Sequence, residues 1–77
     1  MKKIQILGTG CPKCNQLYQN AKVAVEDAGI QADVEKVTDL NDIMALGVMV
    51  TPALAIDGQV KTSGKVPSAD DIKKMIQ

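Results

Sequence analysis

Residues 3–14 read KIQILGTGCPKC, in which a short apolar pattern runs directly into a pair of cysteines. Residues 3–7 have the apolar and β-branched composition of a strand, and the glycines of residues 8–10 close it. Pro12 suits the first turn of a helix, where the N–H that proline lacks would have no intrahelical partner. This order predicts a CxxC motif at the point where a first strand gives way to a first helix.

The helix that starts at Pro12 is predicted to extend over residues 12–28, with Gly29 after its last turn. Its apolar residues recur at intervals of four, three and four, at Leu17, Ala21, Ala24 and Ala28. Residues 32–37 then alternate between apolar and charged side chains, which indicates a strand exposed on one face. Thr38 or Asp39 can cap a second, shorter helix that ends at Gly47.

The second half of the chain predicts a hairpin followed by a helix. The mostly apolar segment 48–56 stops at Asp57-Gly58, a strong signal for a two-residue hairpin turn, and residues 59–62 return as its partner strand. Residues 68–71 resemble a capping box at the start of a last helix. The predicted order is β-α-β-α-β-β-α, an α/β fold with a mixed four-stranded sheet and three helices. The length of 77 residues predicts one domain, 1–77.

Composition excludes several classes of function. Nine lysines balance nine acidic residues, so no net positive charge is available to bind nucleic acid. The sequence has no arginine and no histidine, and Tyr18 is its only aromatic residue. Bidentate phosphate binding, histidine-dependent hydrolysis and base stacking are therefore not expected. No apolar run reaches membrane-spanning length and residues 1–8 lack a signal-peptide core, so we expect a cytoplasmic protein without a membrane partner.

The CPKC motif carries the chemistry that the sequence predicts. Cys11 lies at the expected helix start, where unpaired N–H groups and the helix dipole stabilise a thiolate, with Lys13 adding positive charge. Cys14, about one turn further on, can attack a mixed disulfide formed on Cys11. Other uses of two such cysteines are a structural disulfide, half of a zinc site, a Cu(I) carrier and a dithiol that switches binding to one partner.

A proline before an apolar strand, in Thr51-Pro52, is ordinarily trans. Together with the CxxC, the Asp57-Gly58 turn and the last helix, however, this dipeptide makes the chain resemble the thioredoxin superfamily. It is most similar to the small prokaryotic thioredoxin-like and glutaredoxin-like proteins known as redox-active disulfide proteins. The resemblance extends from KIQILGTGCPKC through VTPALAIDGQV to SADDIKKMI.

This resemblance implies a thioredoxin-like fold and a protein disulfide oxidoreductase. Cys11 matches the attacking cysteine, Cys14 the resolving one and Pro52 the cis-proline, while Thr51 matches the residue whose backbone pairs with substrate. We also expect substrate contacts at Gly10, Pro12 and Lys13.

The implied partners are disulfide-containing protein substrates and a protein resembling thioredoxin reductase, acting on a monomer. The redox-active disulfide itself serves in place of a cofactor, and we expect no metal and no nucleic acid. The sequence departs from the superfamily in having Gln5 where many thioredoxins carry a buried acid. It also lacks the glycine pair of glutaredoxins, since Ser63-Gly64 stands there, which disfavours glutathione.

Several remaining residues are predicted to be structural. Tyr18 should pack beside Cys14, and Met44, Met49 and Met75 should fill the core.

Overall fold

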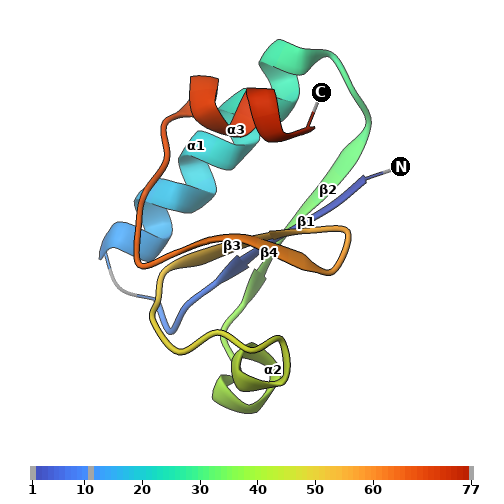
Figure 1. Cartoon of the computed structure of the whole chain (residues 1–77). Coiled ribbons are helices and arrows are strands. Elements are labelled where there is room, and N and C mark those ends of the chain that lie inside the picture. The colour runs from blue at the N-terminus through green and yellow to red at the C-terminus, as the bar shows by residue number, and fades with distance from the viewer. Residues whose placement is uncertain (1, 11, 77) are drawn as a thin grey trace.

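The computed structural model describes residues 2–10 and 12–76, and its elements follow the predicted order (Figure 1). The described strands and helices are β1 (Lys2–Leu7), α1 (Pro12–Ala28), β2 (Ala32–Val37), α2 (Leu40–Ala45), β3 (Ala53–Ile56), β4 (Gln59–Ser63) and α3 (Ala69–Ile76). They confirm the predicted α/β class, with a mixed four-stranded sheet and three helices in the described part of the chain.

The sheet has the strand order β2-β1-β3-β4, with β1 and β3 at its centre. Strand β1 pairs in parallel with β2 and antiparallel with β3, and β3 pairs antiparallel with β4. In the β1–β3 pair, Leu7 lies opposite Ala53. The chain therefore leaves β1 and enters β3 at the same end of the sheet. This register brings the segment before the CPKC motif next to the Thr51-Pro52 dipeptide.

Helices cover both faces of the sheet (Figure 1). On one face α1 and α3 enclose a cluster of buried residues that includes Ile4, Ile6, Leu17, Leu54, Ile56 and Ile72. On the other face α2 contributes Ile43 to a smaller cluster with Leu7, Val48, Ala53 and Ala55. Because β3 supplies buried side chains to both clusters, its four residues are all apolar rather than alternating.

The helix ends form as the sequence predicts. Gly29 has a φ of 65° after α1, a left-handed conformation that glycine adopts without steric cost. Asp39 caps α2 by accepting a hydrogen bond from the Asn41 N–H at 2.8 Å. At α3, Ser68 Oγ accepts from the Asp71 N–H at 3.2 Å, and Asp71 Oδ2 accepts from the Ser68 N–H at 3.4 Å. This reciprocal pair is the predicted capping box.

The β3–β4 turn closes the hairpin and is also hydrogen-bonded to strand β1. Asp57 and Gly58 both have positive φ, 52° and 83°, as a tight hairpin turn requires. The Asp57 N–H donates to the Lys3 carbonyl at 2.8 Å, and Asp57 Oδ1 accepts from the Lys3 N–H at 3.0 Å. The bond from the Lys3 N–H holds the pKa of the exposed Asp57 carboxyl below its usual range.

The methionine predictions are partly wrong. Met75 is half-buried against the larger cluster, but Met44 is 61% exposed and Met49 is 96% exposed. Helix α2 has only six residues, and Ile43 is the one it buries, while Met49 lies in the connection to β3. Tyr18 packs against the larger cluster, which confirms its predicted packing role but does not test its predicted place beside Cys14. Among the described residues, no helix is both long and apolar enough to span a bilayer.

We predict that Leu54→Ala lowers the free energy of unfolding by about 2–5 kcal/mol, because Leu54 is fully buried and the lost side chain leaves a cavity. Leu40→Ala is the matched control. Leu40 is 59% exposed, so its truncation should change stability by less than about 0.5 kcal/mol. Urea denaturation of both variants measures the difference, and equal losses would contradict the described core.

Candidate functional site

Cys14 is the described half of the dithiol, and it is buried. It lies in the first turn of α1, which begins at Pro12, and only 5% of it is exposed. Cys11 falls outside the described residues, so its predicted role stays a prediction. Along the chain it directly precedes the first residue of α1.

Gly8 makes room for the Cys14 sulfur. A β-carbon built on Gly8 would overlap Cys14 Sγ and would lie 3.2 Å from Cys14 Cβ and 3.9 Å from Pro52 Cα. The Gly8 N–H donates to the Val37 carbonyl at 3.0 Å, which holds this backbone against β2. Gly8 therefore lies close to the Cys14 sulfur and to the backbone of Pro52, and no side chain larger than that of glycine fits at this position.

Sequence reasoning missed the role of Gly8 at the site. The sequence pattern predicts only that residues 8–10 close the first strand. They do so in the structure, because β1 ends at Leu7. The available signal was the position of this glycine, directly after a central strand and three residues before a cysteine. A glycine at a strand end often marks a close approach of another group to the backbone.

Pro52 lies on the other side of this contact. The Thr51–Pro52 peptide bond is cis, as the resemblance to the thioredoxin superfamily implies, and Pro52 is buried while Thr51 is exposed. The Pro52 carbonyl accepts a hydrogen bond from the Gly64 N–H at 2.8 Å, which joins the start of β3 to the end of β4. A β-carbon on Gly64 would lie 2.8 Å from Val50 Cγ1, so the chain is close-packed on this side as well.

The other predicted contact residues are at the surface. Gly10, Pro12, Lys13 and Thr51 are all exposed. A hollow of about 380 Å³ has Thr9 and Thr51 in its lining, so the segment before the cysteines and the segment before Pro52 meet there. The two sequence motifs are therefore neighbours in space, as the register of β1 and β3 requires.

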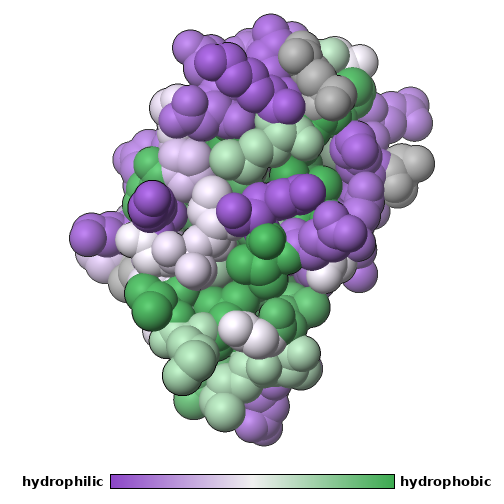
Figure 2. All heavy atoms as spheres, in the orientation of Figure 1, coloured by the Kyte–Doolittle hydropathy of each residue, from purple (hydrophilic) through white to green (hydrophobic). Residues whose placement is uncertain are grey.

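Exposed apolar side chains lie in the lining of this hollow or, in the case of Val50, next to its lining residues in the sequence. They come from α2 and from the connection between α2 and β3, and they are Leu40 (59% exposed), Met44 (61%), Met49 (96%) and Val50 (56%). We call these four residues the α2 apolar surface. Figure 2 shows apolar side chains gathered over the α2 end of the molecule. Clustered exposed apolar residues of this kind mark surfaces that bind other proteins.

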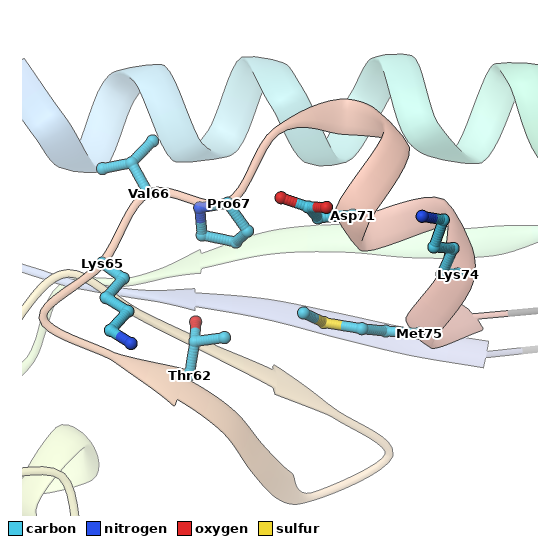
Figure 3. A pocket seen from close by; sticks show the side chains of 7 residues that line it. All are labelled: Thr62, Lys65, Val66, Pro67, Asp71, Lys74 and Met75. Carbon is cyan, nitrogen blue, oxygen red and sulfur yellow. The ribbon is translucent and has the colours of Figure 1, made fainter.

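A second hollow, of about 580 Å³, lies between β4 and α3, and Cys14 is not among the residues that line it (Figure 3). Its apolar wall includes Val66, Pro67 and Met75, and Lys65 and Lys74 lie at its rim. The Asp71 carboxylate that points into it already accepts the capping-box hydrogen bond. None of the residues predicted to act on substrate lines this hollow.

Metal ligands do not converge in the described part of the chain. Within residues 2–10 and 12–76, no group of three or more His, Cys, Asp or Glu side chains is arranged to hold a metal ion.

Comparison with known proteins adds to this geometry. The family model described as "Thioredoxin domain" matches residues 2–77 of the chain. The chain belongs to the thioredoxin family. Its relatives include a protein named thioredoxin from Methanocaldococcus jannaschii, 52% identical over 77 residues, which are all of this chain and 88% of that protein. Another protein named thioredoxin, from Methanothermobacter thermautotrophicus, is 45% identical over 76 residues, or 99% of each chain. The predicted thioredoxin-like family is thereby confirmed, and the chain is assigned to the protein disulfide oxidoreductases.

We predict that Gly8→Ala destabilises this thioredoxin-family protein by about 1–3 kcal/mol, because the added methyl group overlaps the Cys14 sulfur. The same change made in a Cys14→Ala background should cost less, since the sulfur is then gone. A double-mutant cycle from urea denaturation measures the difference. Equal costs in the two backgrounds would show that the sulfur is not what excludes a side chain at Gly8.

Proposed function

We propose that this chain reduces or exchanges disulfide bonds in proteins, with Cys11 as the attacking thiol and Cys14 as the resolving thiol. The observation that carries this proposal is the position of Cys14, buried in the first turn of α1 against Gly8, which is itself close to Pro52. A thiol held there is close in sequence to Cys11 and shielded from a bulky substrate. Those are the requirements for a group that acts only after a mixed disulfide has formed.

The reaction follows thiol–disulfide exchange. The Cys11 thiolate attacks one sulfur of a substrate disulfide, forming a bond to it and releasing the other substrate sulfur as a thiolate. The Cys14 thiolate then attacks Cys11 Sγ, which forms the Cys11–Cys14 disulfide and releases the second substrate thiolate. Two electrons have moved from the enzyme dithiol to the substrate. A thioredoxin-reductase-like protein would return the pair of cysteines to the dithiol state.

The order in which the two cysteines react follows from the burial of Cys14 and from the unpaired N–H groups at the start of α1. Cys14 is 5% exposed, so a protein disulfide cannot approach its sulfur in line. Cys11 directly precedes Pro12, the first residue of α1, and the unpaired N–H groups of a helix start favour a thiolate at that position. Lys13, which is exposed in the same turn, adds positive charge beside it.

The substrate would bind along the exposed side of the site. Thr51 offers backbone groups to an extended segment, and Gly10, Pro12 and Lys13 flank the sulfur of the mixed disulfide. The α2 apolar surface then receives apolar side chains near the substrate cysteine. Two of its four residues are methionines, whose flexible and polarizable side chains adapt to different partners. Such a surface suits several protein substrates and a reductase better than one fixed ligand.

Membership of the thioredoxin family favours this oxidoreductase over the Cu(I) carrier and over the dithiol-switched binding protein. In the proposed cycle, the Cys11–Cys14 pair acts as the redox centre of a monomer.

We expect iodoacetamide to alkylate Cys11 before Cys14 when the reduced protein is treated at mildly acidic pH. The Cys11 thiolate is favoured by the helix start, whereas Cys14 is buried. Peptide mapping of the partly labelled protein identifies the modified residue. Faster labelling of Cys14 would reverse the assignment. A matched pair of variants provides the control, because reduced Cys14→Ser should trap a mixed disulfide with disulfide-bonded insulin and reduced Cys11→Ser should not.

A charge introduced on the α2 apolar surface should slow the reduction of protein disulfides more than the reduction of small disulfides. We predict that Met49→Lys lowers kcat/KM for insulin reduction by about threefold to tenfold, because about 1 kcal/mol of apolar contact is lost. Reduction of a small aromatic disulfide, which does not reach this surface, should change less than twofold. Val23→Lys is the control, since Val23 is also exposed, at 45%, but lies on α1. Equal effects of the two variants on insulin would contradict docking at α2.

A further inference from the structure

Two methionine side chains line the same hollow beside the candidate site. Met44, in α2, and Met49, in the connection from α2 to β3, are both in the wall of the hollow of about 380 Å³ that Thr9 and Thr51 also line. Met44 is 61% exposed and Met49 is 96% exposed. Their thioether groups are therefore open to small reagents in the solvent, which is unusual for residues that ordinarily fill a core.

Methionine differs from other apolar residues in its reactivity. A peroxide transfers one oxygen atom to the thioether sulfur, which loses two electrons and becomes a sulfoxide, while the peroxide is reduced to water or an alcohol. The product is polar and chiral, whereas the parent side chain is flexible and apolar. Leu40, on the same α2 apolar surface, has no atom that a peroxide oxidises in this way.

The burial of α2 decides what such an oxidation would change. Ile43 is the residue that α2 buries, and it joins the helix to the smaller cluster. An oxygen atom added to Met44 or Met49 has solvent beside it, so this anchor stays intact. Met75, by contrast, packs half-buried against the larger cluster. Oxidation at α2 therefore alters a surface, whereas oxidation of Met75 places a polar group at the edge of the core.

We propose that Met44 and Met49 form a reversible modification site, which peroxides convert to sulfoxides and methionine sulfoxide reductases restore. The inference rests on the proposed function, because it places the modification on the surface that receives protein substrates. With both sulfoxides formed, two of the four side chains of the α2 apolar surface are polar, and protein disulfides dock less well. The cysteine pair is unchanged, so small disulfides are still reduced.

The return reaction balances with a dithiol as reductant. Methionine sulfoxide reductase removes the sulfoxide oxygen as water, and two thiols supply the two electrons and become a disulfide. One enzyme acts on each of the two sulfoxide epimers, so full recovery needs both. The exposure of Met44 and Met49 gives these enzymes access to the sulfoxides without unfolding of the chain.

The first experiment maps the oxidation. The protein is treated with hydrogen peroxide while its cysteines are paired as a disulfide, which protects them from the reagent. Tandem mass spectrometry of the peptides then follows the sulfoxide fraction at each methionine with time. We expect Met49 to react first, Met44 second and Met75 last, in the order of their exposure. Oxidation of Met75 before Met49 would contradict the assignment of the site.

The second experiment compares protein and small substrates. After the peroxide is removed, dithiothreitol reduces the cysteines and leaves the sulfoxides in place. The oxidised protein should have a kcat/KM for insulin about threefold to tenfold below that of the untreated protein, because apolar contact is lost. Reduction of a small aromatic disulfide should change by less than about twofold, since it needs no docking surface. Treatment with both methionine sulfoxide reductases should restore insulin reduction.

Matched variants identify the sulfur atoms responsible. Met44→Leu/Met49→Leu keeps the surface apolar but removes both sulfurs, so its insulin reduction should be the same before and after peroxide. Met75→Leu leaves the α2 apolar surface oxidisable and should lose activity as the parent does, with an unchanged urea midpoint. Met1 lies outside the described residues and is common to all these proteins, so it cannot account for a difference between them.

Equal losses in Met75→Leu and in Met44→Leu/Met49→Leu would overturn the proposal. Undiminished insulin reduction by protein that carries both sulfoxides would also overturn it, as would a loss that the two sulfoxide reductases do not reverse. Failure of the proposed function is distinguishable, because it appears before any peroxide is added, as a parent protein that does not reduce insulin. That result would remove the basis of this inference as well.

Discussion

The pairing of Leu7 with Ala53 in the two central strands determines where every part of the site lies. Residues that follow β1 and residues that precede β3 must leave the sheet at the same end, so Gly8 meets Pro52 there. Helix α1 starts a few residues later and places Cys14 in the same contact. Gly8 and Pro52, which are 44 positions apart in the sequence (52 − 8), are thus brought together by the backbone hydrogen bonds of the sheet.

The candidate site has two different surroundings. Towards α2 it opens onto apolar side chains that no described residue covers, because this short helix buries Ile43 alone. Cys14 itself lines a separate, smaller hollow of about 120 Å³ together with Ile6 and Lys36. The exposed apolar side chains suit contact with another protein, whereas the smaller hollow has no room for one.

Most of the fold could be predicted because local and long-range signals agreed. Proline at the start of α1, Asp57-Gly58 in the hairpin and Ser68 with Asp71 at α3 each specify their own local structure. The exposed Met44 and Met49 could not be predicted, since their apolar character is the same whether they face a core or a partner. The role of Gly8 and the cavity beside Lys36 depend on distances across the sheet, and a sequence pattern does not contain these distances.

The strand order also decides how the protein presents its sheet edges to other molecules. Strands β2 and β4 form the two edges, and the candidate site lies at the ends of the inner strands. Strand β2 carries Asp33, Glu35 and Lys36, and β4 carries Lys61. Charged residues on edge strands discourage the edge-to-edge pairing that leads to aggregates. The two edges of the sheet are thus protected from pairing with an extended segment of another chain.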